Sequence, residues 1–98
     1  MKNISASEVQ KRLEQGEELN IIDVREVDEV QEGKIPGAIN IPLAIIPVRV
    51  MDLDMDKEYI LVCHSGARSA NAAYFLEEEG FNVINMRGGM CAWRGAVE

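Results

Sequence analysis

The stretch YILVCHSGARSANAAYFL, residues 59–76, carries the pattern from which the fold of this chain can be inferred. It opens with the apolar run YILVC (59–63), which predicts a buried strand, and continues into a helix expected from about 67 to 79. A short loop of small and polar residues joins the two. Strand, loop and helix in this order are typical of parallel α/β sheets. Cys63 is therefore expected at the carboxyl end of a strand.

The remainder of the chain alternates short strands and helices in the same way. Further strands, rich in apolar and β-branched residues, are predicted at 19–24, 38–41 and 82–86. Helices are predicted at 6–15 behind an S-x-x-E capping box, at 26–32, at 43–50 with a break at Pro47, and after Gly89 in a short terminal helix containing Trp93. The acidic segment that follows residue 50 is expected to be a helix end and loop. This pattern predicts one α/β domain, residues 1–98, with helices on both faces of a parallel sheet.

The composition narrows the classes of function. Hydrophobic residues make up 47% and charged residues 28%, the balance of a soluble globular chain. A net charge of −7 argues against a nucleic-acid partner, and no apolar run is long enough to span a bilayer. The polar N-terminus lacks the apolar core of a signal peptide, so a cytoplasmic location is expected.

The cysteines are expected to be free thiols in that compartment, rather than a structural disulfide. No metal is expected, because Cys63, His64 and Cys91 are the only Cys and His residues and lack the spacing of zinc ligands.

The loop after Cys63 has the composition of an anion cradle. Ser65, Gly66 and Ala67 are small, so the backbone can curl and direct its N–H groups, with those of the first helical turn, toward one point. A thiol at that point would have its thiolate favoured, and Arg68 adds a cation suited to an oxyanion. Cys63 is interpreted as an activated nucleophile, the alternative being an inert buried thiol at a strand end.

The neighbours of the loop have less certain roles. Ser69 could donate a hydrogen bond to a bound anion or persulfide, or serve in capping or packing, and His64 is expected to face solvent rather than pair with Cys63. Cys91 is expected to be a packing residue, with a resolving thiol as the alternative. Asp23 and Arg25 lie at the carboxyl end of the strand at 19–24 and so reach the same edge of the sheet, where they are expected to form charge pairs that hold loops.

Glu29 and three apolar residues of the segment 51–55 lie outside the loop. Glu29 is a possible partner for Arg25. The apolar residues Met51, Leu53 and Met55 are expected to make core contacts rather than form a rim for a partner.

Over nearly its whole length the sequence resembles a single-domain rhodanese, a sulfurtransferase. The resemblance rests on the segments IIDVRE, EVQEGKIPGAINIP, LVCHSGARS and NVINMRGGMCAW, in this order. It implies a three-layer domain whose central, mainly parallel sheet has about five strands flanked by helices. Two positions depart from the family pattern: Lys34, where His is usual, and Val30, where an aromatic is frequent. Both lie outside the cysteine loop, so they bear on substrate entry or partner choice.

The resemblance also implies a mechanism and its site. The Cys63 thiolate takes sulfur from thiosulfate or a similar small donor and passes it to a thiol or protein acceptor, without a metal or organic cofactor. Substrate and persulfide are held by His64, Ser65, Gly66, Ala67 and Arg68, with Asp23, Arg25 and Ser69 in support. Two alternatives remain: a sulfur-carrier or interaction module with little turnover, and a cysteine-dependent phosphatase or arsenate reductase. Phosphatases of this fold have one more residue between Cys and Arg than the four, His64 to Ala67, present here.

Overall fold

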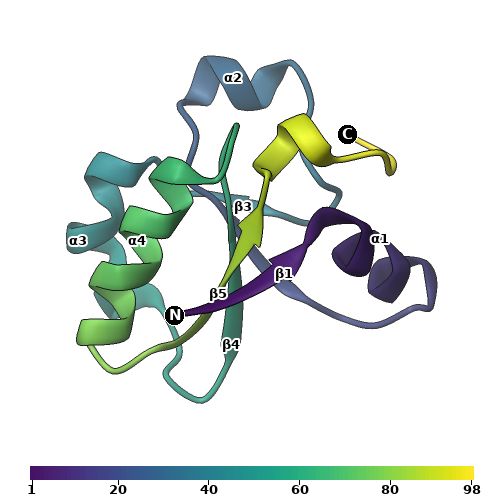
Figure 1. Ribbon diagram of the computed structural model, residues 1–98. Helices are drawn as coiled ribbons and strands as arrows, with labels where there is room; N and C mark the ends of the chain where they lie inside the picture. The colour runs from purple at the N-terminus through teal and green to yellow at the C-terminus, as the bar shows by residue number, and fades with distance from the viewer.

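A computed structural model describes residues 1–98 and has a single sheet of five parallel strands. In the sheet the strands run in the order β1-β5-β4-β2-β3, so the middle of the sheet is β4, the strand that leads into Cys63 (Figure 1). Their bounds are β1 Lys2–Ser5, β2 Asn20–Asp23, β3 Ile39–Asn40, β4 Glu58–Val62 and β5 Asn82–Arg87. The parallel sheet confirms the predicted fold class.

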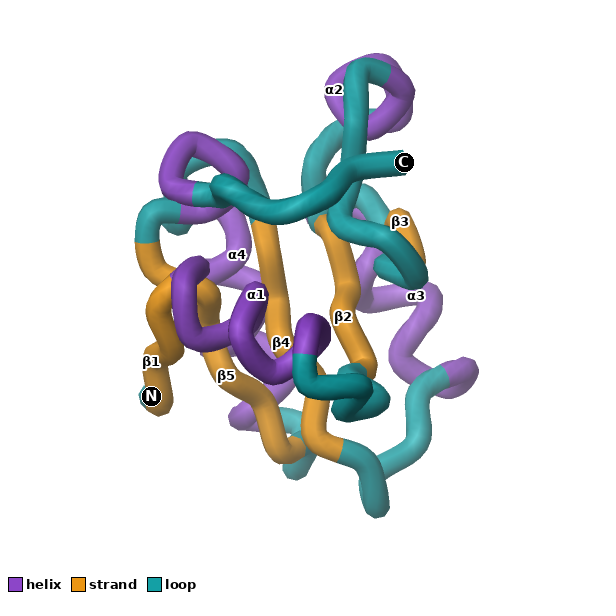
Figure 2. The backbone as a smooth tube through the Cα atoms, turned by 90° about the vertical axis from the view of Figure 1, so that its right-hand side faces the viewer, coloured by secondary structure: helices purple, strands orange, loops and turns teal.

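Helices cover both faces of the sheet. The α-helices are α1 Ala6–Glu14, α2 Val27–Gln31, α3 Ile46–Arg49 and α4 Ala67–Glu78, and short 3₁₀ turns occupy Leu43–Ile45, Val50–Asp52 and Gly89–Ala92. Figure 2 shows α1 in front of the sheet and α3 and α4 behind it, while α2 lies beyond the upper edge. That edge is formed by the carboxyl ends of the strands, as the parallel arrangement requires.

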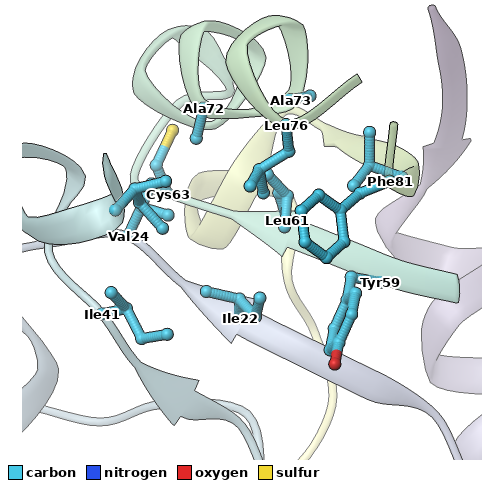
Figure 3. Packing of buried hydrophobic residues seen from close by; sticks show 12 residues of the cluster. Ile22, Val24, Ile41, Tyr59, Leu61, Cys63, Ala72, Ala73, Leu76 and Phe81 are labelled. Atoms are coloured by element: carbon cyan, nitrogen blue, oxygen red, sulfur yellow. The ribbon is translucent and has the colours of Figure 1, made fainter. Parts of the chain in front are cut away.

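Alternation along each strand builds two cores. Ile22 and Leu61 contribute to the cluster under α4, whereas their neighbours Ile21 and Ile60 contribute to the cluster under α1. Figure 3 shows the α4 side, where Leu76 packs above Leu61 and close to Phe81. Because both faces of the central strands are buried, these strands are apolar throughout rather than alternating with polar residues.

The structure corrects several local expectations. Residues 2–5 form strand β1, which was not predicted, and Ser5 caps α1 by accepting from the Glu8 N–H at 3.1 Å. The capping box is one-sided, because the Glu8 carboxylate pairs with Arg12. Trp93 lies just after the terminal 3₁₀ turn rather than within a helix, although it is buried as expected.

The exposed apolar residues also differ from expectation. Met51 is 92% exposed and Met55 is 56% exposed, so neither makes the expected core contacts, whereas Leu53 is partly buried against the core. No helix combines the length and apolar character that a crossing of the bilayer needs.

Candidate active site

Cys63 immediately follows β4 at the carboxyl edge of the sheet. Its side chain is fully buried within the α4-side core, where Figure 3 shows the sulfur between Val24 and Ala72. The residue is free, as is Cys91. Burial alone would make this an inert thiol, so its chemistry depends on the polar groups that reach the sulfur.

Two donors reach the Cys63 sulfur. The backbone N–H of Gly66 donates to Sγ over 3.0 Å, and the Ser69 hydroxyl lies 3.3 Å from it. Burial raises the pKa of Cys63, but hydrogen bonds from Ser69 and from the backbone at Gly66 and Ser65 lower it, and the balance is a lowered pKa. The site therefore favours the thiolate, the nucleophilic form of cysteine.

Gly66 shapes the cradle through its backbone. It precedes α4 with a φ of +105°, a left-handed conformation that other residues adopt only with strain. A Cβ there would lie 3.3 Å from the backbone nitrogen of Gly88. The Cys63 loop and the Gly88–Gly89 loop are thus in close contact.

The second loop is fastened to the first by backbone hydrogen bonds. Met90 N–H donates to the Cys63 carbonyl at 2.8 Å, and Cys91 N–H donates to the His64 carbonyl at 2.9 Å. A Cβ on Gly89 would lie 2.4 Å from the Cys63 carbonyl oxygen. Only glycine permits this approach, and this is the physical role of the Gly pair noted in the sequence.

Ser69 connects Cys63 to a residue that sequence reasoning did not single out. Its hydroxyl also lies 2.5 Å from Oδ1 of Asn85, whose Nδ2 donates to the Gly66 carbonyl at 3.3 Å. Ser69 and Asn85 are both buried. A hydroxyl has one proton, so Ser69 can donate to only one of three acceptors in reach: Sγ of Cys63, Oδ1 of Asn85 and the Gly66 carbonyl oxygen at 3.2 Å. The only sequence signal was a polar residue inside the otherwise apolar strand NVINM.

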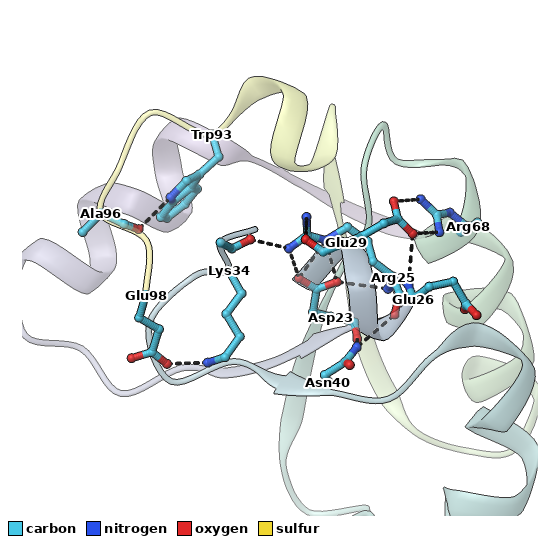
Figure 4. Close-up of polar contacts among 11 residues, drawn as sticks. Asp23, Arg25, Glu26, Glu29, Lys34, Asn40, Arg68, Trp93, Ala96 and Glu98 are labelled. Atoms are coloured by element: carbon cyan, nitrogen blue, oxygen red, sulfur yellow. Dashed lines mark hydrogen bonds and ion pairs between the residues drawn. The ribbon is translucent and has the colours of Figure 1, made fainter. Parts of the chain in front are cut away.

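Arg68 is paired with a carboxylate from another helix. Its Nη1 and Nη2 contact the two carboxylate oxygens of Glu29 at 2.6 and 2.8 Å, and Figure 4 shows this fork-to-fork geometry. The hydrogen bond from Arg68 and one from the Glu26 N–H lower the pKa of Glu29 to about 2. The expected partner of Glu29 was Arg25, which touches only its carbonyl, at 3.4 Å.

Asp23 and Arg25 form the expected charge pair, and both are buried. The Arg25 guanidinium donates to both carboxylate oxygens of Asp23 and also to the Gly33 carbonyl at 2.8 Å. Asn40 donates to the carbonyls of both residues (Figure 4). The pair and Asn40 therefore connect the end of β2, the turn after α2 and the end of β3. No hydrogen bond joins the pair to Cys63.

The remaining loop side chains point to solvent. His64, Ser65 and Ala67 are exposed, as expected for His64, and the His64 Nε2 lies 3.1 Å from Sγ of Cys91 rather than against Cys63. Cys91 is exposed too, so it is not the packing residue that was expected. No group of three or more acidic, Cys or His side chains is arranged to hold a metal ion.

A pocket of about 340 Å³ lies elsewhere, between α1, the Pro36 turn and Trp93. None of the residues 63–69 lines it. The candidate site is the loop itself, and it is separate from this pocket.

Together, the fold and the site define an α/β domain with a buried cysteine thiol of lowered pKa at a strand–loop–helix junction. Residues 5–96 match the rhodanese-like domain family, and the chain belongs to that family. It is 47% identical over all 98 residues to "Putative sulfurtransferase YtwF" of Bacillus subtilis, covering 95% of that protein. It is 40% identical over 97% of its length to "Putative sulfur carrier protein YrkF" of the same organism, covering 52% of that protein.

Among solved structures, a rhodanese-like domain protein from Staphylococcus aureus superimposes with a TM-score of 0.94 at 35% identity. The match covers 100% of this chain and 97% of the other. The expected fold family is thereby confirmed.

Proposed function

We propose that this protein is a sulfurtransferase that carries sulfane sulfur as a persulfide on Cys63. The observation that carries the proposal is the Gly66 N–H on the Cys63 sulfur, at 3.0 Å, with the Ser69 hydroxyl within reach of the same atom at 3.3 Å; both donors favour the thiolate at this buried strand end. The relatives named as sulfurtransferase and sulfur carrier support the same chemistry.

In the first half-reaction the Cys63 thiolate attacks the outer sulfur of a donor such as thiosulfate. The bond between the two sulfur atoms of thiosulfate breaks, its electron pair leaves with sulfite, and a Cys63 persulfide forms. The terminal sulfur is then the anion, and the N–H groups of residues 64–68 at the start of α4 are the donors offered to it. Ser69 then no longer faces a thiolate, and its proton can stay in the hydrogen bond to Oδ1 of Asn85 that the structure already has.

In the second half-reaction a thiol, a protein nucleophile or cyanide attacks the outer sulfur. The persulfide bond breaks, the acceptor keeps that sulfur, and the Cys63 thiolate is restored. Covalent catalysis of this kind replaces one difficult transfer with two easier steps, and neither step needs an oxidant, a metal or an organic cofactor.

The experiment is intact mass measurement after incubation with thiosulfate. We expect one added sulfur on the wild type, none on Cys63→Ser, and thiosulfate:cyanide turnover only where the sulfur is added. Circular dichroism of Cys63→Ser should match the wild type. A serine variant that still turns over at the wild-type rate would contradict the proposal.

A sulfur-carrier role is the second candidate, favoured by the similarity to the relative named as a carrier. The same experiment separates the two roles. A carrier would gain the sulfur and hold it, with slow release to small thiols or cyanide, whereas an enzyme would cycle.

The loop length favours sulfur over phosphate chemistry. With only His64 to Ala67 between Cys63 and Arg68, fewer amides surround the thiol than a phosphoryl group with three equatorial oxygens requires. The protein should therefore not hydrolyse aryl phosphates, whereas a variant with one Gly inserted after Gly66 should lose sulfur transfer. Efficient hydrolysis by the wild type, abolished in Cys63→Ser, would refute this choice.

A further inference from the structure

We propose that Glu29 sets the charge of the sulfur donor, by neutralising Arg68 so that the site prefers a low-charge organic persulfide to divalent thiosulfate. The inference rests on the proposed function and concerns the donor class of the same site. It is carried by the bidentate contact between the two side chains.

Arg68 is the single cation of the cysteine loop, residues 63–69. It lies in the first turn of α4, and its pKa is raised by the hydrogen bond to Glu29 and further by the charges of Glu29 and the Cys63 thiolate. Arg68 is five residues after Cys63 in the same loop, so its positive charge favours negative charge on the Cys63 sulfur. A negative charge paired with Arg68 therefore reduces the positive charge that the loop offers to the reacting sulfur.

Glu29 is held in position to cancel that charge. Both of its carboxylate oxygens contact Arg68, and Oε1 also accepts the Glu26 N–H at 3.0 Å (Figure 4). The carboxylate is thus fixed from its own helix as well as from α4. The Arg68 and Glu29 side chains are 35% and 32% exposed, so the pair is open to solvent and to small molecules dissolved in it.

The other cations near this edge either are paired with a carboxylate or lie outside the cysteine loop. Arg25 is paired with Asp23, and Lys34 with Glu98. Arg87 and Arg94 are exposed and lie outside the loop. The chain as a whole carries a net charge of −7, which repels anions further.

The neutral pair penalises donors according to their charge. Thiosulfate brings two negative charges toward a thiolate, whereas an organic hydropersulfide, R–S–SH, brings at most one. Its reaction is balanced in the same way: the Cys63 thiolate attacks the outer sulfur, R–S⁻ leaves, and Cys63–S–SH remains. Only the donor charge differs between the two reactions.

The test measures the second-order rate constant for loading sulfur onto Cys63, by intact mass, with two probes: thiosulfate and 2-hydroxyethyl persulfide. Four proteins give a charge cycle: wild type, Glu29→Gln, Arg68→Gln and the double variant. Asp52→Asn is the matched control, because it removes the same charge from another ion pair, that with Arg49, in the 3₁₀ turn at Val50–Asp52.

The readout is the ratio of the thiosulfate rate constant to the persulfide rate constant, which cancels changes in the reactivity of the thiolate itself. We expect Glu29→Gln to raise this ratio about three- to tenfold and Arg68→Gln to lower it by a similar factor, as one charge acting on a divalent anion through partly screened solvent would do. The double variant and Asp52→Asn should lie within about twofold of wild type, and high salt should shrink all differences.

If the pair had a purely structural role, both single variants would change the ratio of the two rate constants in the same direction. That result, or an unchanged ratio in Glu29→Gln, would overturn the inference while sulfur loading of the wild type upheld the proposed function. Absence of loading from both probes on the wild type would overturn the proposed function, and this inference with it.

Discussion

Replacement of Gly89 by alanine tests whether the contact between the two loops holds the site together. Gly89 has a φ of +54°, and an added Cβ would lie 2.4 Å from the Cys63 carbonyl oxygen and 2.6 Å from that of His64. Both oxygens belong to backbone that is itself hydrogen-bonded, so neither can rotate away. The loops would have to separate.

The cost can be estimated from its parts. The left-handed conformation costs a non-glycine residue roughly 1–2 kcal/mol, and forcing a methyl group into a packed contact costs about 1–3 kcal/mol. Separation would also weaken the bonds from Met90 N–H and Cys91 N–H, each worth about 1 kcal/mol. We therefore expect Gly89→Ala to lower the free energy of unfolding by about 3–5 kcal/mol.

Gly16→Ala is the matched control. Gly16 has a φ of +84°, but a Cβ there would meet nothing within 4 Å, so that variant should lose only the backbone contribution of roughly 1–2 kcal/mol. Urea denaturation of both variants gives the two free energies. Loading of sulfur from thiosulfate should also fall roughly tenfold or more in Gly89→Ala, because the Gly66 N–H moves away from Sγ. Equal destabilisation by the two substitutions would refute the reasoning.

Three further outcomes are expected. The pKa of Glu29 in the folded protein, about 2, lies below its ordinary value of 4.5. The pair with Arg68 therefore stabilises the protein fully above pH 4.5 and loses this contribution as the pH falls through 2. Because both side chains are about one-third exposed, the loss should be only about 1 kcal/mol, seen in acid denaturation of wild type and absent in Glu29→Gln. Ser69→Ala in a Cys91→Ser background should raise the pKa of Cys63, measured as alkylation rate against pH, and an unchanged profile would mean that the hydroxyl does not serve the thiolate. Cys91→Ser should retain sulfur loading on Cys63, and loss of loading with an intact fold would show that Cys91 takes part in the chemistry.

The sequence predicted the centre of the fold better than its edges. The strand leading to Cys63 is buried on both faces, so its apolar run was unambiguous. The end of this strand and the start of the following helix then gave the bounds of the loop between the two. Strand β1 was missed because Lys2–Ser5 is short and mostly polar, as an edge strand with exposed residues can be. Met51 was misjudged because an apolar side chain in a short irregular segment carries no periodicity that says which way it points.

The polar partners of the site were less predictable. Glu29 and Arg68 are 39 residues apart, and several acidic residues near Glu29 offered the same charge, so only the position of α2 in space identifies the pair. Asn85 depends on the register of β5 beside β4, which places it next to Ser69. Residue types alone do not encode such long-range registers, whereas the short Cys63 loop is determined by its own neighbours.

The Gly66 donor to the thiol is a backbone group, and the side chains at His64, Ser65 and Ala67 are exposed. The loop therefore holds the thiol through a backbone group, whereas the groups that it presents to a partner are side chains. Exchange of these three side chains would change what the loop offers to an incoming protein while leaving the amide donor to the sulfur in place. Such a loop can be diversified in a library for new acceptors without rebuilding its nucleophile, provided that Gly66 and its contact with the Gly88–Gly89 loop are kept.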